Sequence, residues 1–428
     1  MINPEPHWKH GKCRLCRSSL LQCVITLKPI PVGEHYTQEP LMFEAPRYPI
    51  DIYQCTKCGA VQTQDNINPE ILWSSYTYYS GMTESIVRHF EQFFNDTMAR
   101  YKFKSNSSIL DIGSNDGSLL SIFDRYGWET LGVDPAKTVA NVAISKGIST
   151  LVGLYGSDQI DRKLTGHSFD LITAFNVFAH SNSMDCMLSS VKKHLSPAGI
   201  FSFEVQYLLD ISKKVILGTF FHEHMIHYSL HAIINFLQSG GLKVIGYSRN
   251  NIQNGSLIVY ATHRECSLHD DVESLSSLNE LINLEIKEGI HNSSWSYPFI
   301  LNVNRSIRAC HDFLEAAKVP KKSIVGYGAA RSGPLLTIQY VLEEYLCFLV
   351  DDHPAKCGKF APLASLEVLP TKILDATKNP LALILAYIHW KPIIQNNIRY
   401  LDAGGCFLIL WPCFKVINKK NYSLALHE

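Results

Sequence analysis

The chain lacks any excess of one charge and any long apolar run. Its 428 residues include 39 basic and 39 acidic side chains, and no polybasic stretch occurs. This balance argues against nucleic acid or an anionic membrane surface as the main partner. The longest apolar runs, such as residues 381–387, fall far short of the roughly 20 residues that span a bilayer. We therefore expect no membrane segment.

The N-terminus also lacks the basic and then apolar pattern of a secretory signal peptide. From this we expect a cytoplasmic protein. Its 12 cysteines are then predicted to be reduced thiols or metal ligands rather than disulfides. The length allows two or three domains, each with its own core.

The apolar pattern predicts an α/β protein with a β-rich module (1–72), a central domain (73–265) and a C-terminal domain (266–428). Helices are expected over 84–101, with Thr83 as N-cap, and within 268–318. The expected strands of two parallel sheets are 108–112, 130–134, 170–175, 200–205 and 257–262, then 323–328, 345–351, 381–386 and 406–410. Residues 195–199 are expected to form a turn.

Two Cys-x-x-Cys pairs stand in the first module, Cys13 with Cys16 and Cys55 with Cys58, and 38 residues separate them. Four thiolates from two such pairs suit a tetrahedral zinc ion. Such a site has no open coordination position, so its predicted role is structural. A redox dithiol pair and unliganded cysteines are the alternatives.

A glycine-containing loop follows the strand expected at 108–112. After it come a helical pattern and a second strand that ends on Asp134, about 20 residues beyond the glycines, where a carboxylate reaches a ribose hydroxyl. The spacing is not that of a pyrophosphate-binding loop. An acid at the strand end before a glycine turn is typical of S-adenosylmethionine (SAM)-dependent methyltransferases; a domain that binds another nucleoside, or none, is the alternative. The candidate cofactor-binding residues are Asp111, Gly113, Ser114, Asn115, Asp116, Gly117, Asp134 and Asn176.

Residues 221–228 hold three histidines, His222, His224 and His227, together with Glu223. Their spacing is not that of the His-Glu-x-x-His zinc motif. A histidine beside a carboxylate suits proton abstraction near neutral pH. Further candidates are His180, which follows the strand at 170–175, and the pair Tyr76 and Tyr78. A core or surface role is the alternative for each of these residues.

A second glycine loop, Gly326-x-Gly328, precedes Asp351 by 25 residues. Three interpretations are open at this point: the next helix holds the diphosphate of a sugar nucleotide, the fold has no ligand, or the loop binds NAD. The last is the basis of a rival function, a nicotinamide-dependent sugar-nucleotide oxidoreductase. A non-enzymatic zinc scaffold would leave the histidines and the SAM motif without a purpose.

Taken in order along nearly the whole chain, these motifs resemble the sugar C-methyltransferases, which act on nucleotide-activated 4-keto-deoxysugars at carbon 3. The resemblance implies a zinc-binding domain, a central class I, Rossmann-like SAM domain and a C-terminal Rossmann-like α/β domain, with the sugar nucleotide in the cleft between. It rests on the cysteine pairs, Tyr76-x-Tyr78-x-Ser80, residues 111–117, 176–180, 203–205, 222–224, 326–329 and 351–358, Pro362, and Gly404-Gly405.

Carbon methylation next to a ketone needs a base, and we expect His224 to be that base, oriented by Glu223. Tyr76, Tyr78, His180 and His222 complete the expected catalytic set. Arg331, Lys356 and Tyr327 are expected to contact a dTDP-, CDP- or GDP-linked sugar. We expect a monomer or weak homodimer.

The chain departs from the family pattern at a few positions. Phe221 and His227 stand where the family has tyrosines, residues 253–256 (Gln-Asn-Gly-Ser) replace His-Gly-Gly-Ser, and Ser332 replaces a frequent lysine. We expect these positions to affect which sugar is used rather than the reaction, because the SAM motif and His-Glu-His are intact.

Overall fold

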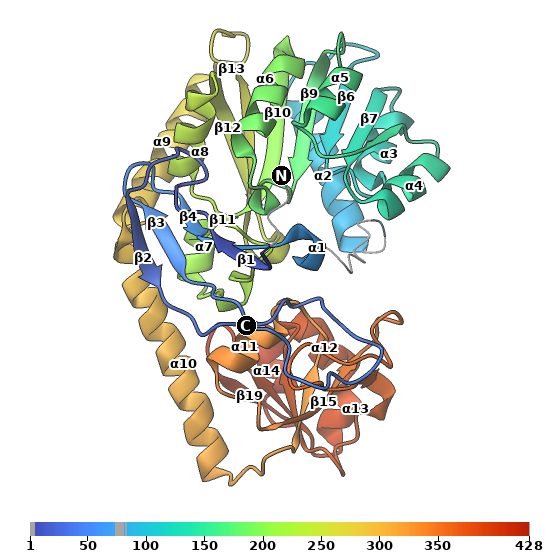
Figure 1. The fold of residues 1–428 in the computed structure, drawn as a ribbon, viewed down its shortest axis with the longest axis vertical. Coiled ribbons are helices and arrows are strands. Elements are labelled where there is room, and N and C mark those ends of the chain that lie inside the picture. The colour runs from blue at the N-terminus through green and yellow to red at the C-terminus, as the bar shows by residue number, and fades with distance from the viewer. Residues whose placement is uncertain (1–4, 73–80, 82–83, 428) are drawn as a thin grey trace.

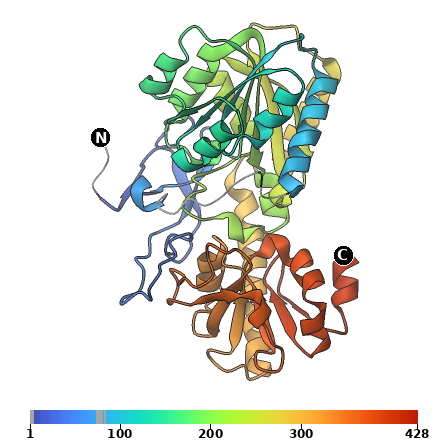
Figure 2. The same ribbon diagram turned by 90° about the vertical axis from the view of Figure 1, so that its right-hand side faces the viewer.

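The computed structural model describes residues 5–72, 81 and 84–427. Two α/β parts lie one above the other, and the N-terminal segment runs beside both (Figures 1 and 2). The helices are α1 (Pro69–Leu72), α2 (Glu84–Arg100), α3 (Ser118–Arg125), α4 (Lys137–Ser145), α5 (Asp158–Lys163), α6 (Met184–His194), α7 (Leu208–Lys213), α8 (Leu230–Ser239), α9 (Val272–Lys287), α10 (Ser296–Ala316), α11 (Gly333–Gln339), α12 (Trp390–Asn396), α13 (Ile398–Asp402) and α14 (Tyr422–His427), with short 3-10 turns that include η2 (Phe178–His180), η3 (Leu217–Thr219) and η4 (Ile252–Asn254).

The strands form four sheets. They are β1 (His7–Lys9), β2 (Leu21–Ile25), β3 (Ile52–Cys55), β4 (Val61–Thr63), β5 (Asp65–Ile67), β6 (Ser108–Ile112), β7 (Glu129–Asp134), β8 (Thr150–Val152), β9 (Phe169–Phe175), β10 (Leu195–Gln206), β11 (Ile226–His227), β12 (Leu242–Asn250), β13 (Ser256–His263), β14 (Ile324–Tyr327), β15 (Leu346–Asp351), β16 (Val368–Pro370), β17 (Leu381–Ile384), β18 (Cys406–Ile409) and β19 (Lys415–Ile417). Every strand expected from the sequence is present. In the two large sheets, the strands β8, β12, β16 and β19 had not been predicted.

The central sheet has the order β12-β13-β10-β9-β6-β7-β8. Its strands run parallel except β13, which is antiparallel to both β10 and β12. The strands β9 and β6, with β10 beside them, end at one carboxyl edge, so the segments that follow them converge there. In open parallel sheets this edge is where ligands bind.

The predicted turn at 195–199 is wrong. Leu195 already pairs with Phe169, and the next pair is Ile200 with Leu171, so the residues between them bulge within β10. Pro197 lies in this bulge and has no amide hydrogen to give to the sheet. The turn signal in the sequence therefore marks an irregular strand.

The C-terminal sheet has the order β16-β15-β14-β17-β18-β19. It is parallel except for the edge strand β19, which pairs antiparallel with β18. Helix α10 runs along the side of the molecule from the central part to this sheet (Figure 1). No helix among the described residues is long and apolar enough to cross a membrane.

The N-terminal module is built around a sheet of order β11-β4-β3-β2. Its first strand, β11, belongs to the segment that carries His224, and it pairs Ile226 with Gln62 and His227 with Val61. The Thr63 amide donates to the Met225 carbonyl over 3.1 Å. The module and the histidine segment therefore share one sheet.

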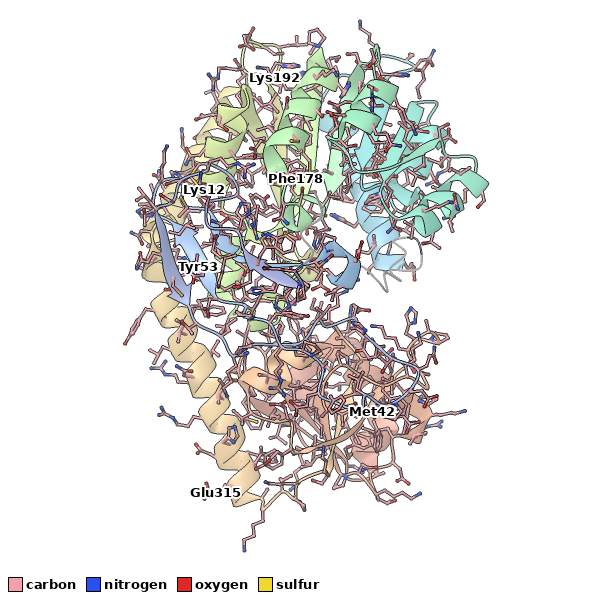
Figure 3. The ribbon with its side chains drawn as sticks, in the orientation of Figure 1. Lys12, Met42, Tyr53, Phe178, Lys192 and Glu315 are labelled. Carbon is pink, nitrogen blue, oxygen red and sulfur yellow. The ribbon has the colours of Figure 1, made fainter. Side chains whose placement is uncertain are left out.

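A long loop of the same module, residues 26–51, is fastened to the C-terminal part. Thr37 and Phe360 exchange two main-chain hydrogen bonds of 3.0 and 2.9 Å. The Leu41 amide donates to Ser365 Oγ at 3.0 Å, and Met42 lies over the C-terminal sheet region (Figure 3). One N-terminal module thus contacts both α/β parts.

Candidate functional site

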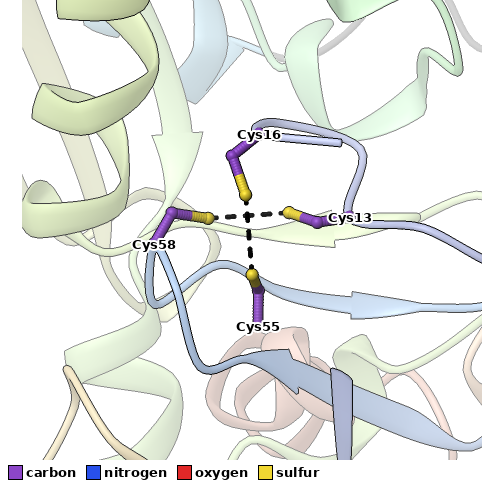
Figure 4. Close-up of side chains that lie close together, drawn as sticks. All are labelled: Cys13, Cys16, Cys55 and Cys58. Atoms are coloured by element: carbon purple, nitrogen blue, oxygen red, sulfur yellow. Dashed lines mark hydrogen bonds between the residues drawn. The ribbon is translucent and has the colours of Figure 1, made fainter. Parts of the chain in front are cut away.

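The four cysteines of the two pairs converge. Their sulfur atoms all lie within 4.8 Å of one another, with Cys13 and Cys58 3.5 Å apart and Cys16 and Cys55 3.6 Å apart (Figure 4). Zinc–sulfur bonds of about 2.3 Å in a tetrahedron imply sulfur–sulfur separations of about 3.8 Å. A disulfide would need about 2.05 Å. The tetrad therefore fits a zinc ion and contains no disulfide.

The first glycine loop is folded against the end of β7. The Gly113 amide donates to the Val133 carbonyl over 2.7 Å, and the Asn115 amide donates to Asp134 Oδ2 over 2.9 Å. The second oxygen of Asp134 accepts from the Ala136 amide at 2.8 Å. A carboxylate has about four acceptor positions, so Asp134 can still receive ribose hydroxyls.

Gly113 is required for a close approach. Its φ is 69°, and a Cβ there would lie 2.4 Å from Val177 Cγ2. Val177 follows Asn176 at the end of β9, where the Asn176 amide donates to the Glu204 carbonyl at 2.9 Å. The glycine loop and the segment 176–180 are therefore in direct contact.

Asp111 is buried at the end of β6 and accepts from Thr173 Oγ1 at 2.7 Å. Burial raises the pKa of Asp111 to about 7, the Thr173 hydroxyl opposes this, and the negative charge of Asp134 adds to it. An apolar site favours the neutral acid in this way. A cationic ligand group would favour the carboxylate instead.

The other predicted residues of the loop make contacts within the protein. The Asp116 amide donates to Asn115 Oδ1 at 2.9 Å. Asp116 itself accepts from Ser118 Oγ at 2.6 Å and from Lys146 Nζ at 3.0 Å. Ser114 Oγ points at Gly132 of β7. These contacts shape the loop, and Gly117, with φ 75°, begins α3.

A pocket lies beside this loop at the ends of β9 and β10. It is lined by Asn176, Ala179, His180, Val205, Gln206, His224, Ile226, His227, Tyr228 and Gln253. The His180 and His224 rings are 5.2 Å apart. Two of the sequence-predicted catalytic residues are thus brought together near the SAM motif.

The protonation of His224 follows from its contacts. Its Nδ1 lies 2.9 Å from the Thr219 carbonyl, and a carbonyl only accepts, so Nδ1 carries the hydrogen. Burial lowers the pKa of His224 well below its usual value, and the nearby histidines His180 and His227 lower it further. The neutral ring therefore keeps its lone pair on Nε2.

The side chain of Glu223 is not hydrogen-bonded to His224, which it was expected to orient. Its side chain is buried, and Oε2 has no hydrogen-bond partner among the described residues. His224 Nδ1 instead contacts the hydroxyl and the main-chain carbonyl of Thr219. The Glu223 carbonyl, however, accepts from His180 Nδ1 at 2.6 Å, so the segment orients His180 through its main chain.

The remaining candidates are placed as follows. His222 Nε2 donates to the Pro49 carbonyl at 3.1 Å and is not among the pocket-lining residues. His227 lines the pocket with Nε2 unpartnered among the described residues, and burial lowers its pKa to about 3. Tyr76, Tyr78 and Thr83 lie outside the described residues.

The predicted substrate-binding cations meet at Glu34. Arg331 Nε lies 3.3 Å and Lys356 Nζ 3.2 Å from Glu34 Oε1. Gly33 makes this approach possible, because a Cβ there would lie 2.4 Å from the Arg331 carbonyl. Tyr327 is separate from this cluster, and its hydroxyl accepts from Asn397 Nδ2 at 3.0 Å. Glu34 had no signal in the sequence.

The second glycine loop repeats the main-chain arrangement of the first. The Gly328 amide donates to the Val350 carbonyl at 2.8 Å. The Ala329 amide donates to Asp351 Oδ2 at 2.7 Å, and the His353 amide donates to Oδ1 at 2.7 Å. Asp351 thus stands in its sheet as Asp134 does in the central one. The arrangement suits the binding of a second nucleoside at the carboxyl edge of the C-terminal sheet.

Comparison with known proteins identifies the kind of enzyme. A C-methyltransferase C-terminal domain matches residues 251–412, a methyltransferase domain matches 86–246, and a proposed zinc binding domain matches 13–73. The C-methyltransferase NovU of Streptomyces niveus is 25% identical over 413 residues, which are 96% of this chain and 97% of that protein. These matches identify the chain as a SAM-dependent C-methyltransferase.

Other relatives of this C-methyltransferase match shorter stretches. A ubiquinone biosynthesis O-methyltransferase of Rhodopseudomonas palustris is 29% identical over 97 residues, 22% of this chain and 38% of that protein. The crystal structure of a SAM-dependent methyltransferase from Clostridium acetobutylicum covers 46% of this chain and 95% of its own, with 14% identity and a TM-score of 0.34.

Replacing Cys55 by serine should remove zinc from the purified protein, because three thiolates and a hydroxyl bind it less well than four thiolates. Metal analysis should give about one zinc per chain for the unaltered protein, by the four-ligand rule, and clearly less for Cys55→Ser. Cys23→Ser is the matched control, since Cys23 is an exposed thiol outside the tetrad, and it should keep its zinc. Equal zinc in both variants would rule out the tetrad as the site.

Replacing Asp111 by asparagine should stabilise the ligand-free protein above neutral pH. The folded pKa of Asp111 lies above its unfolded value, so its ionised form opposes folding, and this cost grows as pH rises from about 4 to about 7. Chemical denaturation should show a higher free energy of unfolding for Asp111→Asn at pH 8, by at most about 4 kcal/mol at 1.36 kcal/mol per pKa unit.

The stabilisation by Asp111→Asn should be nearly lost at about pH 3, where the aspartate is largely protonated in both the folded and the unfolded state. The exposed carboxylate of Asp124 on α3 gives the control, since Asp124→Asn should show no comparable gain at either pH. A variant no more stable than the unaltered protein at pH 8 would contradict the burial effect on Asp111.

Proposed function

We propose that this C-methyltransferase methylates carbon 3 of a nucleotide-linked 4-keto-deoxysugar in the synthesis of a branched deoxysugar. The observation that carries the proposal is the neutral ring of His224, which lines a pocket beside the SAM motif. Its acceptor nitrogen, Nε2, suits removal of a proton from carbon next to a ketone. Nearly full-length similarity to a C-methyltransferase supports it.

The chemistry begins at the sugar. The 4-keto group acidifies the hydrogen on carbon 3, and His224 Nε2 takes that hydrogen as a proton and leaves its electron pair in an enolate. When bound, SAM supplies a methyl group on a positive sulfur, and the carbon–sulfur electron pair stays on sulfur as the new carbon–carbon bond forms. Holding the two carbons in near-attack geometry lowers the barrier.

The roles of the neighbouring residues follow from their hydrogen bonds. Because His180 Nδ1 donates to the Glu223 carbonyl and burial lowers the pKa of His180 to about 4, its neutral Nε2 is an acceptor. This suits a proton relay better than a hydrogen-bond donor to the enolate oxygen. We assign the donor role to Tyr76 and Tyr78. Glu223 and His222 act on the shape of the segment.

On the cofactor side, we assign Asp134 to the ribose hydroxyls. Asp111 and Gly113 would hold the amino-acid tail, and Asn176 would contact the region of the sulfonium. The raised pKa of Asp111 fits this role, since an ammonium group next to it would restore the carboxylate. Ser114, Asn115, Asp116 and Gly117 hold the loop in shape.

On the sugar-nucleotide side, Arg331 and Lys356 offer two positive charges for the diphosphate, and the edge at Tyr327 and Asp351 suits the nucleoside. The positive charge of Arg331 partly opposes the burial that raises the pKa of Glu223, and Glu223 is the neighbour of His224 in the chain. We propose a division into zinc-binding (1–72), SAM-binding (73–265) and sugar-nucleotide-binding (266–428) domains.

Incubation with SAM and a panel of dTDP-, CDP- and GDP-linked 4-keto-6-deoxyhexoses tests the substrate class. Mass spectrometry should show the gain of one methyl group on at least one of them. Absorbance at the nicotinamide wavelength should stay constant, and a change with NAD(H) would instead favour the oxidoreductase.

Replacing His224 by alanine should abolish turnover and leave binding intact. Loss of a general base typically lowers the rate about 100- to 10,000-fold. In deuterated water without SAM, the unaltered protein should exchange the carbon 3 hydrogen of its substrate, and His224→Ala should not. NMR of the recovered sugar nucleotide measures this exchange.

The control for His224→Ala is His263→Asn, because His263 Nε2 also donates to a main-chain carbonyl, that of Leu195, away from the pocket. That variant should exchange normally. Exchange that persists in His224→Ala but stops in a His180 or Tyr76 variant would move the base to that residue.

A further inference from the structure

The side chain of Gln206, at the end of β10, is held by two groups of fixed character. Its Nε2 lies 3.1 Å from the Gln253 carbonyl, and Thr219 Oγ1 contacts its Oε1. Because a carbonyl only accepts, the amide nitrogen must face Gln253 and the amide oxygen must face Thr219. The orientation of the amide is therefore determined.

This orientation of the Gln206 amide determines where the hydroxyl hydrogen of Thr219 points. Gln206 Oε1 only accepts, so the Thr219 hydroxyl must donate its hydrogen to it. Thr219 Oγ1 also lies 3.1 Å from His224 Nδ1, and with its own hydrogen used it can only accept there. The hydroxyl and the Thr219 carbonyl, 2.9 Å away, both require a hydrogen on Nδ1.

Both residues of this hydrogen-bond chain belong to regular secondary structure. Thr219 ends η3 and is buried, and Gln206 pairs with Ser256 in the central sheet. The sheet edge that faces the SAM loop thus reaches His224 through two side chains. We propose that Gln206 and Thr219 are positioning residues, which hold His224 in the tautomer with the Nε2 lone pair at the pocket. The catalytic consequence rests on the proposed function, whereas the tautomer does not.

The test uses Gln206→Met, which keeps the size of the side chain and removes both hydrogen bonds. The freed Thr219 hydroxyl can then turn and donate to His224 Nδ1, which favours a hydrogen on Nε2. A hydrogen bond of ordinary strength would shift the tautomer ratio by about 3- to 10-fold. Nitrogen-15 NMR of histidine-labelled full-length protein, without substrate, measures the tautomer.

A second variant separates positioning from general damage. In Gln206→Met with Thr219→Val, no hydroxyl is left to donate to Nδ1, so the carbonyl of residue 219 should restore the hydrogen on Nδ1. The double variant should therefore have more of the Nδ1–H tautomer than Gln206→Met alone. Two merely structural losses would add instead. Thr219→Ser, which keeps the hydroxyl, should exchange substrate hydrogen faster than Thr219→Val.

The functional readout is carbon 3 exchange with the same sugar-nucleotide panel. Gln206→Met should lower kcat and the exchange rate in proportion to the lost Nδ1–H tautomer, by at most about 3- to 10-fold, with KM unchanged. Thr262→Val is the control, because its buried hydroxyl donates to the Gly199 carbonyl at 2.8 Å away from the pocket, and it should match the unaltered protein.

Two failures are distinguishable. An unchanged His224 tautomer in Gln206→Met, or strictly additive losses in the double variant, would overturn the positioning role and leave His224 as the base. Tautomer shifts as expected, together with normal exchange in His224→Ala, would support the hydrogen-bond chain and overturn the proposed base.

Discussion

The pairing of β11 with β4 is the constraint on which the pocket depends. The strand is two residues long, and residues on both sides of it, His224 and Tyr228, line the pocket. Its register, Ile226 with Gln62 and His227 with Val61, fixes where the flanking residues His224 and Tyr228 stand along the pocket. On the other side, the Met225 amide donates to the Ala179 carbonyl at 2.8 Å. The histidine segment, residues 221–228, is thus hydrogen-bonded to the zinc module on one side and to the segment that follows β9 on the other.

Much of the fold follows from short-range patterns in the sequence. The strands β6 and β9 are buried on both faces, so they read as continuous apolar runs. The paired cysteines revealed their common site by spacing alone. Strands of only three residues, such as β8, β16 and β19, are too short to show a recognisable pattern in the sequence. β12 was missed because its polar positions are half-buried along most of its length.

Residue types in the site were predictable, but their orientations were not. The sequence places Glu223 next to His224, and adjacency suggested that the acid orients the base. The structure instead supplies Thr219 from five positions upstream and Gln206 from the sheet, neither of which belongs to a recognisable motif. Glu34 contacts Arg331, which lies 297 positions further along the chain. Such partners depend on how the modules pack, which local patterns do not encode.

Gln253 has an uncommon backbone, with φ of 51° and ψ of 31°, and it meets Gln206 through its main-chain carbonyl. This contact therefore depends on the backbone conformation of Gln253 and not on its side chain. Many residue types could stand at 253 and still present the same carbonyl, with glycine the least strained among them. The orientation of the Gln206 amide, and through it the Thr219 hydroxyl, therefore depends on the direction of one main-chain carbonyl.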